Sequence, residues 1–342
     1  MPKIELLKPH QQRVARRRLL TTVARIALVA SLGAVSQTFA QMSGYPNKPI
    51  RLIVPFAAGT SVDLVARIFA QRLSAEIGSA VIVEPRPGGG SILGTQYVAQ
   101  AAPDGYTLLL GSNSALTIAP FMQSSLKYDP IKSFVPVVGL FTTSSVLLAR
   151  AELPVQNLGD VIELARKSPG KISYGSYGIG TIPHLSMAIL ETRTNTTFNH
   201  IPYKGGSEAG QAAAAGDVDL GFETVPGATA RIKTGRVKPI AIFQAKRSLH
   251  LPQIPSTVET GNGDANILGF VGVFAPAGTP SDVIAKLGGA AKAALQDPEF
   301  NKGLNGLGAE PLPLTASELA AVIVREMESV GTTIKRLSIK AE

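Results

Sequence analysis

Residues 50–77 read IRLIVPFAAGTSVDLVARIFAQRLSAEI, and this stretch decides the fold class. The run at 50–55 is mostly apolar, as in a buried strand. From 61 to 77, apolar residues recur at three- and four-residue steps, which predicts an amphipathic helix. Small residues join the two, so backbone N–H groups could approach an anion closely, and Ser61 or Asp63 could cap the helix. The connection at 55–63 is therefore either an anion-binding turn or a tight strand-to-helix turn.

The same alternation continues along the chain. Further strands are predicted at 80–84, 106–112, 145–149, 172–176, 198–203, 218–222, 237–243 and 267–276. Helices are predicted from the glycine-rich loop to about 101, and at 157–168, 183–195, 206–216, 224–234, 280–296 and 315–337. Strands interleaved with helices indicate an α/β protein with parallel sheets covered on both faces.

The elements fall into two series, with no repeat of solenoid period and no low-complexity linker. We expect a two-lobed α/β architecture in which each lobe is a mostly parallel sheet flanked by helices. The first lobe is predicted to comprise 41–143 plus 268–342, and the second 144–267. Because the chain would cross twice between the lobes, the crossing strands form a hinge and a cleft lies between the lobes.

The first forty residues are typical of a secretory signal peptide. A region with five arginines precedes the apolar run IALVASLGAV at 26–35, and TFA at 38–40 gives a cleavage point after Ala40. The apolar run is too short to be a stable membrane span. We therefore expect export, and a periplasmic location.

Charge and cysteine content exclude several classes of function. Residues 1–40 hold seven of the 33 Lys and Arg and one of the 24 Asp and Glu, so the rest has 26 basic against 23 acidic residues. A balance of about +3 predicts no nucleic-acid partner. With no cysteine, structural disulfides, thiolate metal sites, a cysteine nucleophile and a lipid anchor on cysteine are all excluded.

Ligands of open α/β sheets bind beyond the carboxyl ends of the strands, and four such ends are rich in Gly and Ser. They are PFAAGTSVD at 55–63, RPGGGS at 86–91, GSNS at 111–114 and YGSYGIGTIPH at 174–184. In the last, Gly178 and Gly180 free the backbone, Thr181 is a good N-cap, and Pro183 suits a first helical turn. The N–H groups of such a turn favour a carboxylate or phosphate, although a capped helix start without ligand fits each turn taken alone.

No complete catalytic, nucleotide or metal motif is present. The glycines do not have dinucleotide-fingerprint or nucleophile-elbow spacing, and no His pair suits zinc, so neither cofactor nor metal is predicted. His184 lies in the predicted cleft and could bond a ligand or act as a base. His200 and His250 are interpreted as structural or surface residues. Glu223 ends a strand of the second lobe, where it could bind a ligand or begin the next helix.

Six segments, taken in order over residues 50–280, carry a resemblance to a known family. They are IRLIVPFAAGTSVDLVAR, VIVEPRPGGGSILGT, AAPDGYTLLLGS, YGSYGIGTIPHL, IPYKGG with AAGDVDLGFE, and GFVGVFAPAGTP. Together they resemble the Bug-type, TctC-like substrate-binding receptors of tripartite tricarboxylate transporters. The resemblance implies a two-lobed periplasmic-binding-protein, or Venus-flytrap, architecture that closes around a small organic carboxylate.

The resemblance also implies roles for individual residues. Phe56 packs on the ligand, the turn of Ala58, Gly59, Thr60 and Ser61 presents backbone amides to a carboxylate, and Asp63 holds that turn. Ser112 and Asn113 add polar contacts from the first lobe. Gly178, Thr181 and His184 face them from the second lobe, with Tyr203 and Glu223 near the cleft. The chain departs from the family where Thr60 replaces a common glycine and Pro85 follows Glu84 in place of Asn.

The sequence thus predicts a periplasmic solute receptor, not an enzyme. It is expected to act as a monomer that binds a mono- or dicarboxylate and delivers it to membrane transporter subunits or to a sensor domain. The competing hypothesis is an exported hydrolase or lyase that uses His184 with Ser176 or Glu223. A third is a scaffold or adhesion module that binds no small molecule.

Overall fold

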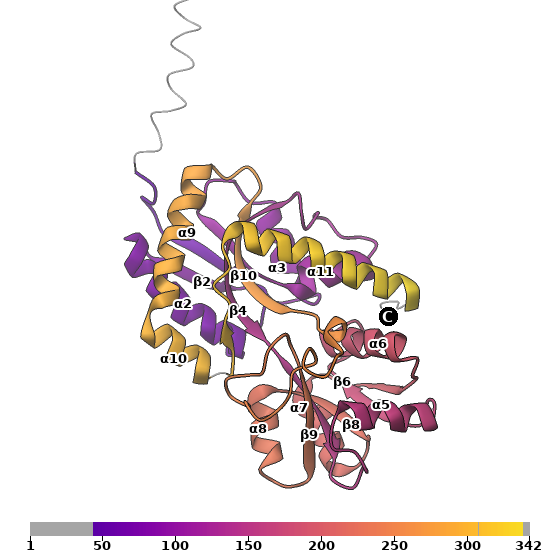
Figure 1. Ribbon diagram of the computed structural model, residues 1–342. Helices are drawn as coiled ribbons and strands as arrows, with labels where there is room; N and C mark the ends of the chain where they lie inside the picture. The colour runs from indigo at the N-terminus through magenta and orange to yellow at the C-terminus, as the bar shows by residue number, and fades with distance from the viewer. Residues whose placement is uncertain (1–43, 307, 338–342) are drawn as a thin grey trace, which may run out of the picture. The chain divides into compact units, whose positions relative to one another are not determined.

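The computed structural model describes residues 44–306 and 308–337. The predicted signal peptide, residues 1–40, lies outside the described residues. The chain divides into two units, residues 1–47 and 48–342, and the features below belong to the second. In its described part are two β-sheets with helices on their faces (Figure 1). No helix among the described residues has an apolar stretch long enough to cross a membrane.

The first sheet has six strands in the order β11-β4-β10-β3-β1-β2. Their bounds are β1 Ile50–Val54, β2 Val81–Pro85, β3 Thr107–Ser112, β4 Phe134–Thr143, β10 Gly269–Pro276 and β11 Glu310–Pro311. Strand β1 pairs in parallel with β2 and β3. Strand β10 is antiparallel to β3 and β4, and β11 is antiparallel to β4. The three parallel strands β1 to β3 therefore end at one edge of the sheet.

Helices pack on both faces of this sheet. One layer is formed by α2 (Ser61–Ile77), α9 (Ser281–Gln296) and α10 (Pro298–Gly306), where the rings of Phe69 and Phe300 meet edge to face with centroids 6.1 Å apart. The other is formed by α3 (Ile92–Ala99), the π-helix η1 (Ser114–Ile118), α4 (Ala119–Met122) and α11 (Ala316–Leu337). Burial on both faces explains the consecutive apolar residues at 52–54 in β1 and at 108–110 in β3.

The second sheet has five strands in the order β7-β6-β8-β5-β9. Their bounds are β5 Ser145–Arg150, β6 Ser173–Ser176, β7 Asn199–Pro202, β8 Leu220–Thr224 and β9 Val237–Phe243. Helices α5 (Leu158–Lys167) and α6 (Ile182–Thr194) contribute to the core on one face, and α7 (Gly206–Ala215) and α8 (Val225–Ile232) to the core on the other. Leu147 and Ala149 of β5 belong to the first core, whereas Val146 and Leu148 belong to the second, as the period of two in a strand requires.

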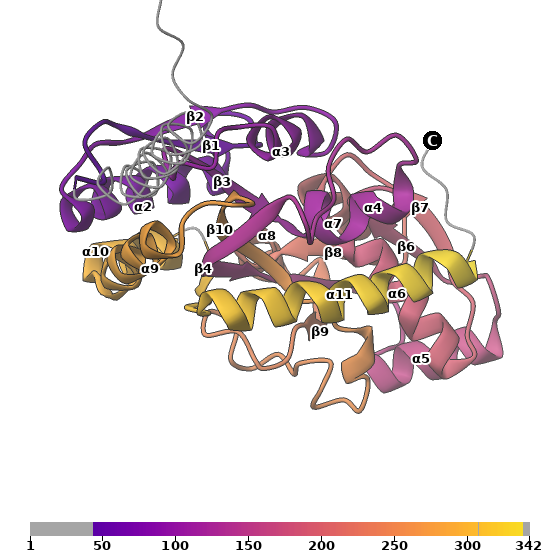
Figure 2. The ribbon, with the colours of Figure 1, turned by 90° about the horizontal axis from the view of Figure 1, so that it is seen from above.

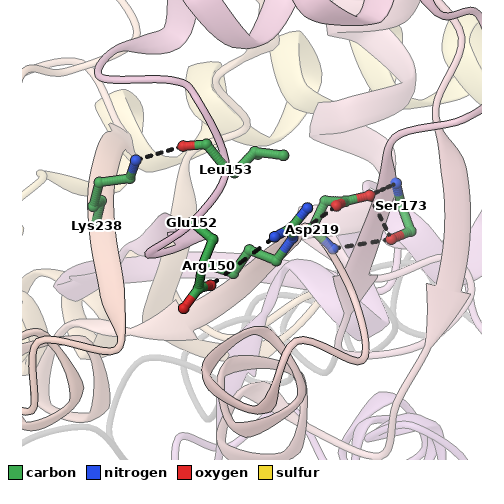
Figure 3. A network of polar contacts seen from close by, with 6 residues as sticks. All are labelled: Arg150, Glu152, Leu153, Ser173, Asp219 and Lys238. Carbon is green, nitrogen blue, oxygen red and sulfur yellow. Dashed lines mark hydrogen bonds and ion pairs between the residues drawn. The ribbon is translucent and has the colours of Figure 1, made fainter.

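A polar network fixes the start of β6 (Figure 3). The carboxylate of Asp219 accepts hydrogen bonds from the backbone N–H and the hydroxyl of Ser173, at 2.9 and 3.0 Å, and from Arg150 Nε at 3.0 Å. The Ser173 hydroxyl in turn accepts from the N–H of Asp219. The network joins Arg150 of β5, Ser173 of β6 and the residue before β8. It therefore holds the first residue of β6 in place relative to β5 and β8.

Among the described residues, the chain crosses twice between the two sheets, and helix α11 packs against parts of both. Strand β4 passes into β5 through Ser144 alone, and residues 244–268 lead from β9 back to β10. Helix α11 packs on β4 and η1 and then on α6, so its last turns reach the second sheet's helices (Figure 2). Its residues Val330 and Ile334 are buried in the same cluster as Leu185 of α6.

The two-lobed α/β fold class is confirmed. Most strands of each sheet run in one direction, as expected, and the reversed strands β5, β10 and β11 make both sheets mixed. For β5 and β10 the reason lies in the crossings. The chain leaves each sheet at the edge that faces the other sheet, where the strand before the crossing ends. The strand after the crossing begins at the facing edge of its own sheet, so it runs opposite to the strands that end there. Strand β5, entering the second sheet, and β10, returning to the first, are these reversed strands.

Candidate functional site

Loops from the carboxyl ends of the parallel strands surround a cavity of about 650 Å³. Glycines after β2, the turn after β6, and residues at the crossing between the sheets all line it. The lining comprises Gly89, Gly90, Ile92, Ser114, Ile118, Ala119, Met122, Gln123, Thr143, Ser145, Tyr177, Gly178, Ile179, Gly180, Thr181, Ile182, Pro183, Pro202 and Phe243. Among the described residues, no charged side chain lines it. This size is in the range of small-molecule sites in proteins.

The turn after β6 brings a helix N-terminus to the cavity. Gly178 and Gly180 have φ of 120° and 75°, values that side-chain-bearing residues rarely adopt. Thr181 is the N-cap of α6, as predicted, but its hydroxyl donates to the carbonyl of Gly178 at 2.7 Å and accepts no hydrogen bond from the N–H groups of the helix. The first N–H groups of a helix have no partner within it, so the N–H of Ile182, the first residue of α6, is available to a ligand in the described part of the chain. The positive end of the α6 dipole therefore faces a cavity without competing charge.

Two stacked imidazoles support this turn from behind. His184 Nδ1 accepts a hydrogen bond from the N–H of Gly180 at 3.0 Å. The His184 ring stacks on that of His200, with centroids 4.2 Å apart and planes at 8°. His200 Nε2 lies 2.6 Å from the hydroxyl of Ser176, which also accepts from the N–H of Gly178 at 3.1 Å. His184 thus holds the turn directly at Gly180, and His200 holds it at Gly178 through the hydroxyl of Ser176.

Burial keeps both rings in the neutral form that this arrangement requires. It lowers the pKa of His184, and burial together with the neighbouring His184 lowers the pKa of His200 to about 4. A protonated His184 could not accept from Gly180. The sequence predicted a structural or surface role for His200 but not its contacts. In the structure His200 of β7 is the register partner of Tyr174 in β6, so its ring lies beside β6.

Asp63 bonds the turn after β1, as predicted, but a different residue caps helix α2. The N-cap of α2 is Thr60, not Ser61 or Asp63, because the Thr60 hydroxyl accepts from the N–H of Asp63 while donating to the carbonyl of Ala57. Asp63 is buried and accepts from the N–H of Gly59 at 2.9 Å and from Arg67 at 3.0 Å. Phe56 is half-buried, and Ala58, Gly59 and Thr60 are exposed.

Of the turn residues whose side chains the structure describes, Phe56, Ala58, Gly59, Thr60 and Asp63 do not line the cavity. They follow β1, however, whose parallel partner β2 leads into the cavity-lining Gly89 and Gly90, so the two turns lie at the same edge of the sheet. Because its hydroxyl is already committed to the cap, Thr60 is less available to a ligand than the sequence suggested.

Ser112 ends β3, and Asn113 follows it, one residue before Ser114 enters the cavity lining. The Asn113 amide donates to the carbonyl of Leu268 at 2.8 Å and accepts from the N–H of Phe270 at 2.7 Å. It therefore holds the start of β10 against β3. The hydroxyl of Ser112 is buried and has no partner among the described residues.

Tyr203 and Glu223 lie near the carboxyl ends of β7 and β8 but do not line the cavity. Glu223 is buried between α7 and α8, where its carboxylate accepts from Arg231 Nε at 2.7 Å. A Cβ at Gly210 or Gly227 would collide with this carboxylate, so the two glycines make room for it. Glu223 therefore does not begin the next helix, which its sequence position also allowed: it lies within β8, Thr224 is the N-cap of α8, and its carboxylate is paired with Arg231 of that helix.

The residues of the enzyme hypothesis do not form a catalytic set. Ser176 is fully buried and bonds to His200 rather than His184. His184 uses Nδ1 on Gly180, and Glu223 is paired with Arg231. In the described part of the chain, no group of three His, Cys, Asp or Glu is placed to hold a metal ion.

Several cavity residues were not predicted. Tyr177 donates its hydroxyl to Ser145 at 3.2 Å, and Phe243 is the register partner of Ser145 across β5 and β9. Met122 ends α4 and lies against Gly180, where an added Cβ would be 3.0 Å from its terminal carbon. Gly89 and Gly90 belong to the glycine-rich turn at 86–91 that the sequence predicted as a possible ligand site. Isolated apolar residues such as Met122 have no local sequence pattern that indicates a role in binding.

The family model for the tripartite tricarboxylate transporter family receptor matches residues 65–339. A UPF0065 protein of Bordetella pertussis is 38% identical over 318 residues, which cover 93% of this chain and 98% of that protein.

Two solved structures are similar over most of the chain. The periplasmic binding protein BugD is 33% identical with a TM-score of 0.68, over 87% of this chain and all of BugD. MatC from Rhodopseudomonas palustris, solved with bound malate, is 28% identical with a TM-score of 0.68, over 85% of this chain and all of MatC. The family is one of periplasmic receptors and not of enzymes. The chain therefore belongs to the tripartite tricarboxylate transporter family of receptors.

Proposed function

We propose that this receptor captures a small organic carboxylate in the 650 Å³ cavity and delivers it to a membrane transporter. The observation that carries the proposal is the N-terminus of α6 and its glycine turn, which offer backbone donors to a cavity lined by no charged side chain among the described residues. Hydrogen bonds from N–H groups to a carboxylate are stronger than those to neutral acceptors, so the site needs no arginine. The malate bound by MatC supports this ligand class.

The predicted organisation of the chain is part of the proposal. A signal peptide at 1–40 directs export, and the lobes are 41–143 plus 268–342 and 144–267. The strand membership of the two sheets supports this division, since β1–β4, β10 and β11 form one sheet and β5–β9 the other. The protein acts as a monomer, and its partner is a set of transporter subunits or a sensor domain. Closing of the lobes removes water, so the ligand stabilises the closed state by its differential affinity.

The predicted ligand contacts divide into two groups. Ile182 binds the carboxylate directly through its N–H, and Gly178 and Thr181, whose own donors hold the turn, line the site beside it. The turn of Phe56, Ala58, Gly59, Thr60 and Ser61, together with Ser112, Asn113, His184, Tyr203 and Glu223, acts at the margin of the site or shapes it from behind.

Thermal unfolding tests the ligand class. Protein freed of bound molecules by unfolding and refolding is heated with organic acids and with their neutral amides, such as benzoate with benzamide and succinate with succinamide. An acid at a hundred times its Kd stabilises the folded state by about 2.7 kcal/mol, and its amide gives a much smaller shift. Equal shifts from acids and amides, or no shift from any acid, would contradict the proposal.

A pair of variants tests the donor. Ile182→Pro removes the N–H at a helix position where proline is tolerated, whereas Ile182→Ala shortens the side chain and keeps the N–H. Loss of one hydrogen bond to a charged group corresponds to about 1.5–3 kcal/mol, or about 10- to 100-fold in Kd. Calorimetric titration should therefore show the proline variant at least tenfold weaker than the alanine variant. Equal affinities would remove Ile182 from the site.

A further inference from the structure

The cavity lining has two chemically different parts. One consists of backbone and hydroxyl groups, at Gly89 and Gly90 and in the turn that leads into α6. The other consists of apolar side chains from several different elements or their flanks. These are Ile92, Ile118, Met122, Ile182 and Phe243. A ligand that fills the cavity must therefore place an apolar body against the second part.

The charged side chains nearest in sequence to this lining, such as Arg86 and Lys204, lie outside it. The guanidinium of Arg86 is paired with Glu84. The imidazole of His184 accepts from Gly180 and is stacked on His200. No described side chain in the lining could neutralise a second carboxylate, and an ionised group without a partner is costly to bury.

The crossing between the sheets contributes hydroxyls only. Tyr177 donates to Ser145, and Thr143 lies two residues away on the same crossing segment. Hydroxyls can bond a ligand's hydroxyl or carbonyl group, but they bring no positive charge to compensate for removing a carboxylate from water.

We propose that the cavity selects acids with a single carboxylate on an apolar body of six or more carbons, as a chain or a ring, over dicarboxylates of the same length. The inference rests on the proposed function, because it assumes that the one carboxylate binds at the α6 turn. It gives the apolar side chains the role of fixing specificity.

Calorimetric titration of the refolded protein with matched pairs tests the selection. The pairs are hexanoate with adipate, and benzoate with terephthalate. The monoacid of at least one pair should bind at least tenfold more tightly than its diacid. A diacid that binds as tightly or more tightly in both pairs overturns the inference while leaving a carboxylate receptor intact. If no acid in the wider panel binds, or if amides bind equally, it is the proposed function that fails.

Charge placed in the apolar wall provides a second test. Met122→Lys adds a cation beside Gly180, and Met122→Leu is the matched apolar control. The affinity ratio of adipate to hexanoate should be at least tenfold higher in the lysine variant than in the leucine variant. Should Met122→Lys fail to fold by circular dichroism, Gln123→Lys adds the same charge from an exposed lining position. A ratio that folded lysine variants leave unchanged would show that missing charge does not set the selectivity.

Discussion

Asp63 shows how one side chain can hold a turn that its neighbours form. It is buried at the first turn of α2, where it accepts from the N–H of Gly59 and from Arg67. Burial alone would raise the pKa of its carboxyl, but the hydrogen bonds from Arg67 and Gly59 together outweigh burial and hold the pKa below its usual range. The charge also lies near the positive end of the α2 dipole. The carboxylate is therefore a stabilising group in its ionised form.

We expect Asp63→Asn to lower the free energy of unfolding by about 1–3 kcal/mol at pH 7. The folded-state pKa lies below that of the unfolded chain, about 3.9, so the stabilisation is present above that pH and is lost as the pH falls through the folded-state pKa. Urea unfolding of both proteins between pH 7 and pH 3 should show the difference shrinking at the acid end. Asp160→Asn, at the same helix position in the more exposed first turn of α5, should cost less. A larger loss at Asp160, or one that is constant with pH at Asp63, would contradict this role.

His184 is the second residue whose part in the site can be isolated. Its Nδ1 accepts from Gly180, and an asparagine side chain can place an oxygen close to the position of that nitrogen. We expect His184→Asn to keep carboxylate affinity within about threefold and His184→Leu to weaken it about tenfold, since one hydrogen bond is worth about 1 kcal/mol or somewhat more. Titration calorimetry of the two variants gives the comparison. Equal loss in both would mean that ring stacking on His200, and not the hydrogen bond, holds the turn.

At the scale of elements, α11 depends on close contact with α4. Gly331 lies in the interior of α11, and a Cβ added there would stand 2.5 Å from the ring of Phe121. The residues around this contact also line a second, smaller cavity of about 290 Å³. A glycine in a helix costs about 1 kcal/mol relative to alanine, so at this position the close approach of the two helices outweighs helix propensity.

The substitution Gly331→Ala should therefore destabilise the protein, by about 1–3 kcal/mol, although alanine is the better helix former. Gly289→Ala in α9 is the matched control, because nothing lies within 4 Å of its added Cβ. It should stabilise by about 0.5–1 kcal/mol. Chemical denaturation of the two variants measures both changes. If both substitutions stabilise, α11 does not rest on Phe121 as described.

At the scale of the molecule, α11 joins parts of the chain that belong to different sheets. It packs on β4 and η1 and then on α6, and Glu326 lies buried along this path. Burial raises the pKa of the Glu326 carboxyl to about 7, although Arg325 and a backbone hydrogen bond from Leu268 oppose the shift. Leu268 ends the connection from β9 to β10, so the carboxyl contacts one of the crossings between the sheets.

This burial should make stability depend on pH. Between about pH 4.5 and 7 the folded state binds more protons than the unfolded chain, so the free energy of unfolding falls as the pH rises and the full cost is present above pH 7. Glu326→Gln should remove this cost and stabilise the protein by on the order of 1–3 kcal/mol at pH 8, with little change at pH 4.5. The exposed Glu328→Gln on the same helix is the control. A Glu326→Gln effect equal at both pH values would contradict the burial argument.

The sequence predicted the regular elements well and the crossings poorly. Helix 61–77 matches α2, because its apolar spacing is strong, and strand 237–243 matches β9. Strand β4 was missed because Pro136 and Gly139 interrupt its pattern and it continues almost directly into β5. The reversed strands β5 and β10 could not be identified, since apolar runs carry no direction.

The same limit applies to the site. Gly178 and Thr181 were predicted and line the cavity, because a glycine turn followed by an N-cap has a local signature. Met122 and Phe243 line it only because the fold brings α4 and the end of β9 to that turn, and no short-range pattern encodes such contacts. The ligand roles of the remaining predicted residues, such as Thr60 and Tyr203, stay predictions.

The most direct measurement is a crystal structure of the refolded protein with the acid that gives the largest thermal shift. The central claim is that uncharged donors at the start of α6 hold the carboxylate. The account predicts a carboxylate oxygen about 2.7–3.2 Å from the N–H of Ile182, with the rest of the ligand against Met122 and Phe243. A carboxylate bound by an arginine or lysine, or an acid bound outside this cavity, would contradict it.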